Sequence, residues 1–230
     1  MRKFDTILFD VDGTLLDFKK TEREALSMTL IQLDILPTEE NIKEYVSVNS
    51  RLWDMLEKGM IKKDLLKTER FRQFFENIHV NADELAASDA YIDNLSKSFF
   101  LIDGAMELCG MRSREYKIAV STNGIAKVQH SRLKLSGLKE HFEYVYISDE
   151  IGHPKPHKEF FDYIFKDMKV RDLNRVIILG DSLTSDIKGG NNAGIATCWY
   201  NPDNLNNNTD SVCDYIIKSL DEFEALITGK

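Results

Sequence analysis

Apolar residues follow two different patterns along the chain, short uninterrupted runs and helical spacing. Short apolar runs are typical of strands that are buried on both faces. The strands predicted from them comprise residues 7–9, 117–120, 144–147, 176–179, 196–200 and 214–217. Because segments of helical character separate the runs from residue 103 onward, the alternation predicts an α/β fold with a parallel, doubly wound sheet.

Residues 18–100 have only the helical pattern. Leu26, Leu30 and Leu33 recur at spacings of four and three, which place them on one helix face. A glycine at position 59 ends one predicted helix, and Asn81 with Glu84 three residues later resembles a capping box that begins another. This region therefore predicts a helical bundle inserted into the α/β domain, which itself comprises residues 1–17 and 101–230.

Composition restricts the possible partners and compartment. The chain has 230 residues and a formal charge of −8, which argues against a nucleic acid polymer as partner but allows a small phosphorylated metabolite. Three scattered cysteines without metal-ligand spacing favour a reducing compartment. No run is long enough to cross a membrane, and the first five residues leave no room for a signal peptide. We therefore expect a cytoplasmic protein; the sequence predicts no oligomeric state.

Two carboxylates follow the first predicted strand directly, in the stretch Asp10-Val11-Asp12-Gly13-Thr14. Alternate residues of an extended chain point to the same side, so Asp10 and Asp12 are expected to face one pocket. A cation could hold one of them ionised while a proton sits on the other, which suggests a metal-bound nucleophile beside an acid/base group. The alternative is a plain helix cap and turn.

Other predicted strands also end in groups that can bind phosphate or metal. Thr122, Asn123 and Gly124 precede a helix N-terminus, where exposed N–H groups suit an anion. Lys155 lies between two prolines, which limit its backbone freedom. Asp181 and Asp186 follow the 176–179 run. Each group alone is a common surface or turn residue, but their joint occurrence at successive strand ends indicates a phosphate and Mg²⁺ site.

These four groups of residues resemble the signature motifs of the haloacid dehalogenase (HAD) superfamily. The resemblance covers the whole α/β portion and implies a Rossmann-like core, with residues 18–100 as its helical cap. It further implies that Asp10 attacks phosphorus and forms an aspartyl-phosphate, and that Asp12 is the general acid and base. Thr122, Asn123 and Lys155 would hold the phosphoryl oxygens.

The same resemblance implies a Mg²⁺ ion as the cofactor. It would be bound by Asp10, the backbone carbonyl of Asp12 and Asp181, with Asp186 as a direct or water-mediated ligand. Dehalogenases of this fold lack the second aspartate because halide needs no proton, so Asp12 argues for a phosphatase.

Within the insert, the segments around Tyr45–Trp53, Glu57–Gly59 and Arg70-Phe71 are similar to the bacterial pyrimidine 5′-nucleotidase branch. That similarity implies a 5′-nucleotidase acting on pyrimidine (deoxy)ribonucleoside monophosphates, with Asn49, Arg51 or Trp53 contributing to specificity. Gly13 stands where some members of the branch have an acidic residue. A sugar-phosphate or phosphoglycolate phosphatase, or a phosphomutase, is the enzyme alternative, and a phospho-accepting switch is the non-enzyme alternative.

Overall fold

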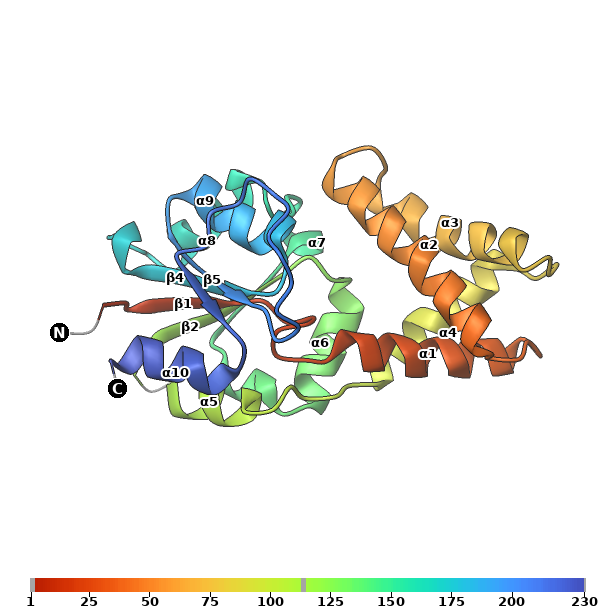
Figure 1. The fold of residues 1–230 in the computed structure, drawn as a ribbon, viewed down its shortest axis with the longest axis horizontal. Coiled ribbons are helices and arrows are strands. Elements are labelled where there is room, and N and C mark those ends of the chain that lie inside the picture. Colours follow the sequence, from red (N-terminus) through yellow and green to blue (C-terminus); the bar gives the residue numbers. More distant parts are fainter. Residues whose placement is uncertain (1–2, 113–114, 230) are drawn as a thin grey trace. The chain divides into compact units, whose positions relative to one another are not determined.

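The computed structural model describes residues 3–112 and 115–229, which divide into two compact units (Figure 1). One unit comprises Met1–Phe18 and Phe99–Lys230, and the other comprises Lys19–Ser98. The elements of the first unit are β1 (Thr6–Phe9), α5 (Ala105–Arg112), β2 (Lys117–Thr122), α6 (Ala126–Leu135), η1 (Leu138–His141), β3 (Tyr144–Ile147), α7 (Ser148–Ile151), α8 (Lys158–Asp167), η2 (Leu173–Arg175), β4 (Val176–Gly180), η3 (Leu183–Ile187), α9 (Lys188–Ala193), β5 (Ala196–Tyr200), β6 (Tyr215–Ile217) and α10 (Leu220–Thr228). The helical unit is formed by α1 (Phe18–Gln32), which begins at the boundary, α2 (Glu39–Glu57), α3 (Lys63–Asn77) and α4 (Glu84–Lys97).

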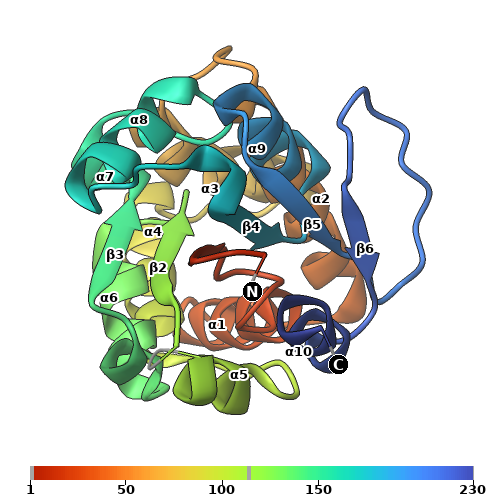
Figure 2. The same cartoon turned by 90° about the vertical axis from the view of Figure 1, so that its left-hand side faces the viewer.

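The six strands form one sheet in the order β3-β2-β1-β4-β5-β6, and every neighbouring pair is parallel (Figure 2). From β1 the chain adds β2 and β3 on one side and then returns to add β4, β5 and β6 on the other. The predicted doubly wound parallel sheet is confirmed. In such sheets ligands bind beyond the carboxyl ends of the strands where the order reverses, which here is the β1/β4 boundary.

Both faces of the sheet are buried, as the uninterrupted apolar runs predict. Along β1, Ile7 and Phe9 pack into the cluster that includes side chains of α5, α6 and α10, whereas Leu8 points to the other face and packs with α8 and α9. The alternation follows from the two-residue period of a strand. A sheet covered on both faces has solvent access at its strand ends, and this leaves the carboxyl edge for ligands.

The helical unit packs around aromatic side chains. Tyr45 of α2 contacts Phe71 and Phe74 of α3 and Tyr91 of α4, with ring centroids 5.1–5.6 Å apart, and all four rings are buried. None of residues 19–98, all of which the structure describes, lies in a strand, as the sequence predicts. Across the described part of the chain, no helix combines the length and hydrophobicity that crossing a membrane requires.

The predicted start of the fourth helix is wrong. Asp83, not Asn81, caps α4, and its carboxylate accepts from the backbone N–H groups of Leu85 and Ala86 at 2.9 and 3.0 Å. Two good capping residues lie two positions apart here, and an aspartate also compensates the positive end of the helix dipole. The helix therefore begins two residues later than the capping-box spacing indicates.

Candidate active site

Lys155 lies buried between two carboxylates at the carboxyl edge of the sheet. Its ammonium donates to Asp10 Oδ1 at 2.8 Å and to Asp186 Oδ1 at 2.5 Å. A third hydrogen bond of 2.6 Å reaches the backbone carbonyl of Ser121 in β2, so all three N–H donors are used. Burial alone would lower the pKa of Lys155, but the two carboxylates outweigh this effect and raise the pKa, so the amine stays charged.

The loop that carries Lys155 is fixed by Asn123. The Asn123 amide accepts from the Lys155 backbone N–H and donates to the Lys155 carbonyl, both at 2.9 Å. These two bonds join the end of β2 to the loop between α7 and α8. The Asn123 side chain therefore positions Lys155, and its amide has a second proton besides the one that it gives to the Lys155 carbonyl.

Three carboxylates meet beside Lys155. Asp10, Asp181 and Asp186 each offer one oxygen, and these oxygens lie within 4.8 Å of one another. Burial raises the pKa of Asp10 to about 7; Lys155 opposes this shift and the charge of Asp186 adds to it. When all three ionise, one ammonium leaves two negative charges unbalanced. The oxygen-only donor set and this excess charge fit a divalent cation such as Mg²⁺.

Asp181 is positioned through its backbone as well as by its place after β4. The indole N–H of Trp199 in β5 donates to the Asp181 carbonyl at 2.8 Å. Gly13 lies against the carboxylate, because a Cβ built on Gly13 would stand 2.2 Å from Asp181 Oδ2. The φ of Gly13 is +86°, which disfavours any residue with a side chain. The Asp181 carboxylate thus occupies the space that a side chain at position 13 would need.

Gly13→Ala is expected to displace Asp181 and strain the loop after β1. We predict a loss of about 1–3 kcal/mol in the free energy of unfolding from the backbone strain. We also predict that Mg²⁺ no longer raises the unfolding temperature, measured by calorimetry with and without the ion. Gly59→Ala is the matched control, because Gly59 has a φ of +70° but no atom within 4 Å of the point where an added Cβ would stand. A Gly13→Ala protein whose response to Mg²⁺ equals that of Gly59→Ala would contradict the prediction.

Thr122 presents its hydroxyl proton to the site. Its Oγ1 accepts from the backbone N–H of Gly124 at 3.1 Å and from the Gln129 amide at 2.8 Å. Because both contacts use Oγ1 as the acceptor, the proton is directed elsewhere and is available to an anion. The side chain is buried, so this donor is held in place by the fold.

Asp12 does not join the cluster of three carboxylates. Its Oδ1 accepts from the guanidinium of Arg132, and its Oδ2 accepts from the Gln129 amide at 2.7 Å. The expectation that Asp10 and Asp12 point together into one pocket is thus met only in part, since Asp12 turns toward α6. Neither Gln129 nor Arg132 was predicted from the sequence. The sequence feature that could have indicated their burial is their spacing: the two polar residues lie three positions apart, next to the apolar residues Val128 and Leu133.

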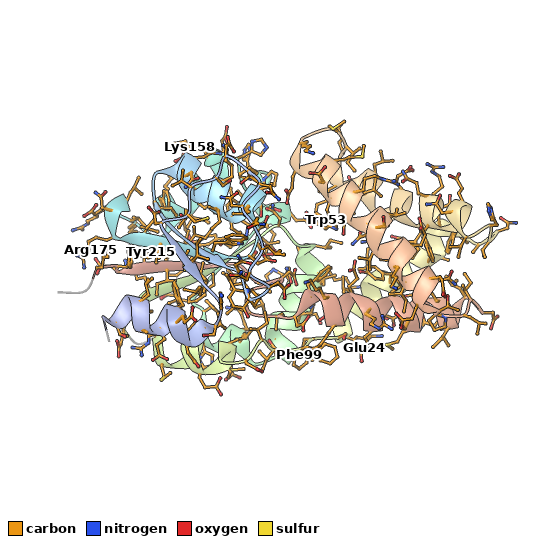
Figure 3. The ribbon with its side chains drawn as sticks, in the orientation of Figure 1. Glu24, Trp53, Phe99, Lys158, Arg175 and Tyr215 are labelled. Atoms are coloured by element: carbon orange, nitrogen blue, oxygen red, sulfur yellow. The ribbon has the colours of Figure 1, made fainter. Side chains whose placement is uncertain are left out.

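The three residues predicted to set specificity lie on α2 in different environments. Asn49 is buried and donates to Glu22 of α1 at 2.7 Å. Arg51 is exposed and donates to Gln73 of α3 at 2.5 Å. Trp53 is half-buried, and its place on α2 is visible in Figure 3. Asn49 and Trp53 are four residues apart on α2 and therefore share a face of the helix, whereas Arg51 lies on another side of it.

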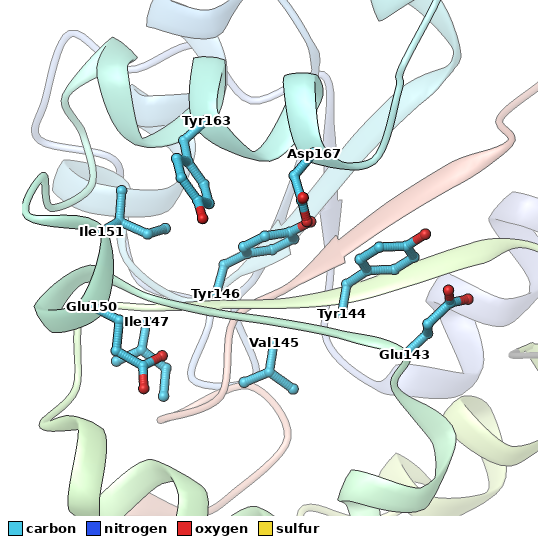
Figure 4. Close-up of a pocket in the computed structure, with 9 residues that line it drawn as sticks. All are labelled: Glu143, Tyr144, Val145, Tyr146, Ile147, Glu150, Ile151, Tyr163 and Asp167. Carbon is cyan, nitrogen blue, oxygen red and sulfur yellow. The ribbon is translucent and has the colours of Figure 1, made fainter.

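A pocket of about 260 Å³ lies at the outer edge of β3 (Figure 4). Tyr144, Tyr146 and Tyr163 line it, and the Tyr146 hydroxyl donates to Asp167 at 2.7 Å. None of the predicted catalytic or metal-binding residues is among its lining residues. This pocket and the carboxylate cluster are therefore different places in the α/β unit.

Known proteins resemble this chain over nearly its whole length. The family described as haloacid dehalogenase-like hydrolase matches residues 7–200. The HAD-hydrolase YfnB of Bacillus subtilis has a magnesium-bound crystal structure that reveals interdomain movement; it is 34% identical with a TM-score of 0.94, covering 98% of this chain and 99% of that one. The pyrimidine 5′-nucleotidase PynA of Streptococcus pneumoniae is 36% identical over 93% of this chain and 90% of its own. The pyrimidine 5′-nucleotidase YjjG of Escherichia coli is 33% identical over 98% of both chains.

Proposed function

The chain belongs to the haloacid dehalogenase-like hydrolases, and we propose that it is a magnesium-dependent phosphatase that works through an aspartyl-phosphate on Asp10. The observation that carries the proposal is the buried Asp10 carboxylate, which ion-pairs with Lys155 and lies within one carboxylate cluster with Asp181 and Asp186. A carboxylate that binds both an ammonium and a cation can approach a phosphate dianion, because the surrounding positive charge offsets their repulsion.

In the first half-reaction a carboxylate oxygen of Asp10 bonds to phosphorus while the bond from phosphorus to the ester oxygen breaks. Asp12 gives its proton to that departing oxygen, so the product leaves as an alcohol. The hydroxyl of Thr122 donates to a phosphoryl oxygen, and the Lys155 ammonium balances the charge of the transferred group.

In the second half-reaction water attacks the phosphorus of the aspartyl-phosphate. Asp12, now a carboxylate, takes a proton from the water, and the bond between phosphorus and Asp10 breaks. Inorganic phosphate leaves, and both aspartates return to their starting states. One residue thus acts first as acid and then as base, which explains why the proposal needs two aspartates.

We propose that Mg²⁺ is held by Asp10, Asp181 and Asp186 and by the backbone carbonyl of Asp12. When bound, the ion supplies positive charge that keeps Asp10 ionised and polarises the phosphoryl group. The fit rests on the oxygen-only donor set and on the two negative charges that Lys155 leaves unbalanced.

Mg²⁺ is expected to raise the unfolding temperature of the protein, because it binds the folded cluster and not the unfolded chain. At a free concentration 100 times its Kd, the ion adds about 2.7 kcal/mol to the free energy of unfolding. Calorimetry in EDTA and in MgCl₂ measures the effect without a substrate. Asp181→Asn should remove the response, whereas Asp210→Asn, at an exposed surface pair with Lys188, should keep it. An equal response in both variants would place the ion elsewhere.

The substrate class that we propose is the pyrimidine nucleoside 5′-monophosphates. Two pyrimidine 5′-nucleotidases at 36% and 33% identity support it, because both match this chain through the helical unit as well as the α/β unit. We further propose that Asn49, Arg51 and Trp53 contribute to the selection. The scattered cysteines support a cytoplasmic location, where such substrates occur.

A panel of phosphomonoesters tests the substrate class. With Mg²⁺ present, phosphate release is expected to have its highest kcat/KM on UMP, dUMP, CMP or dTMP. Higher kcat/KM on purine nucleotides, sugar phosphates or phosphoglycolate would overturn the assignment, and isomerised sugar phosphate without net release would indicate a mutase. A single equivalent of phosphate taken up per protein, without turnover, would indicate a switch. A pyrimidine preference that survives substitution of all three α2 residues would exclude their role.

A further inference from the structure

Both carboxylate oxygens of Asp12 are bound by the same helix. Arg132 donates to Oδ1, and Gln129 donates to Oδ2 at 2.7 Å. The side chains of Gln129 and Arg132 are completely buried, whereas a quarter of the Asp12 side chain is exposed. The two donors are therefore fixed by the protein interior, and the side chain that they hold is partly exposed.

Three local features fix these donors on α6. A spacing of three residues places Gln129 and Arg132 on one face of the helix. The Arg132 guanidinium stands over the ring of Phe18, 5.9 Å from its centroid. Gly124 leaves room for Gln129, because a Cβ on Gly124 would lie 2.2 Å from the Gln129 Nε2 atom. The glycine after Thr122 and Asn123 thus has a packing reason that is independent of phosphate binding.

Gln129 also connects Asp12 to the phosphate site. Its Nε2 atom donates to Asp12 Oδ2 and to Thr122 Oγ1, at 2.7 and 2.8 Å. An amide NH₂ has two protons, so each acceptor receives one. The orientation of the Thr122 hydroxyl and the position of the Asp12 carboxylate therefore depend on the same side chain.

We propose that Gln129 and Arg132 are positioning residues for Asp12: they set where its carboxylate stands relative to the ester oxygen and the attacking water. The inference rests on the proposed function, since it gives Asp12 a proton to transfer. A proton donor displaced by about 1 Å from its productive position costs roughly 10²-fold in rate. The effect of Arg132 should appear in the steps that need Asp12 and not in binding, whereas Gln129 also acts on the Thr122 hydroxyl.

Substrates with different leaving groups distinguish the two steps that need Asp12, protonation of the leaving group and hydrolysis of the aspartyl-phosphate. A nucleoside 5′-alkoxide needs a proton as it leaves, whereas p-nitrophenolate is a stable anion and leaves without one. Hydrolysis of the aspartyl-phosphate needs Asp12 with either substrate. Arg132→Met and Gln129→Met keep the side-chain volume but remove the donors to Asp12. Both should turn over p-nitrophenyl phosphate slowly. Arg132→Met should still release a fast first equivalent of p-nitrophenol, because aspartyl-phosphate forms and then persists, whereas Gln129→Met also loses the contact with Thr122 and should release its first equivalent more slowly than Arg132→Met.

With a pyrimidine nucleotide the same variants should lose about 10²-fold in kcat with little change in KM, because the contacts act on the transition state. Arg132→Lys, which keeps a cationic donor, should recover part of the loss. Lys134→Ala, at an exposed position of the same helix, is the matched control and should behave as wild type. Calorimetry should be used to check that each variant is folded.

A double-mutant cycle tests whether the two residues act through Asp12. Adding Arg132→Met to Asp12→Asn should cause no further loss in p-nitrophenyl phosphate turnover, because the group that Arg132 positions is already removed. The inference would be overturned if Arg132→Met lowered the turnover of the Asp12→Asn protein as much as it lowers that of wild type. It would also be overturned if release of the first equivalent of p-nitrophenol by Arg132→Met slowed as much as its steady turnover. A different result would exclude the proposed function itself: wild type would release no phosphate from any phosphomonoester. If wild type is active and the Arg132 and Gln129 variants have the same activity as wild type, only the positioning role is excluded.

Discussion

Asp10→Asn is expected to lower phosphate release by on the order of 10⁴-fold or more while the fold stays intact. The amide cannot attack phosphorus, and Asp12, the next carboxylate after β1, is bound by Arg132 and Gln129 instead of Lys155. The loss should appear in kcat, with every substrate of the panel, since the variant removes the nucleophile and not a binding contact.

The fold should tolerate this change because Asn is nearly isosteric with Asp and is neutral. Lys155 keeps its ion pair with Asp186 and its bond to the Ser121 carbonyl. Asp162→Asn, at an exposed pair with Lys158, is the control and should keep full activity. Turnover of Asp10→Asn within tenfold of the control would exclude Asp10 as the nucleophile.

Lys155→Met is expected to lower both stability and activity. Removing the amine leaves Asp10 and Asp186 buried and facing each other without a counter-charge. Breaking a buried ion pair in this way costs about 3–5 kcal/mol. In EDTA the unfolding temperature should fall by about 10 °C, as expected for a domain of this size. Mg²⁺ should recover part of the stability, because the ion restores positive charge among the carboxylates, but phosphate release should stay lost.

The matched control for this variant is Lys158→Met. Lys158 follows Lys155 by three residues and pairs with Asp162 on the surface of α8. Exposed ion pairs of this kind contribute about 0.3–0.5 kcal/mol, so the control should unfold within a few degrees of wild type. If both lysine variants lost equal stability, Lys155 would not be the counter-charge of the cluster.

The fold and the placement of Asp10 and Thr122 at one sheet edge could be predicted because both follow from local patterns, whereas Lys155 and Asp186 lie further from their strands and were indicated by their joint occurrence and by the resemblance to the HAD superfamily. Apolar runs identify parallel strands, and the carboxyl ends of parallel strands share one edge. A polar residue directly after such a run must therefore lie at that edge. The start of α4 after Asp83 could not be predicted this way, because two good capping residues lie two positions apart and the apolar pattern does not choose between them.

Gln129 and Arg132, the partners of Asp12, could not be predicted for a different reason. A glutamine and an arginine within a helix are usually solvent-exposed, and nothing in the local sequence shows that these two are buried. Their burial arises because α6 packs against the strand ends with this face inward. The role of Gly13 is similar, since the close approach of Asp181 joins residues far apart in the chain and no local pattern encodes it.

A crystal structure with Mg²⁺ and beryllium fluoride, which mimics a phosphoryl group bound to a carboxylate, tests the central claim most directly. We expect beryllium bonded to a carboxylate oxygen of Asp10, with the Thr122 hydroxyl donating to a fluorine and the Lys155 ammonium beside Asp10 as its counter-charge. Beryllium fluoride bound to any other side chain, in crystals of protein that hydrolyses phosphomonoesters, would contradict it.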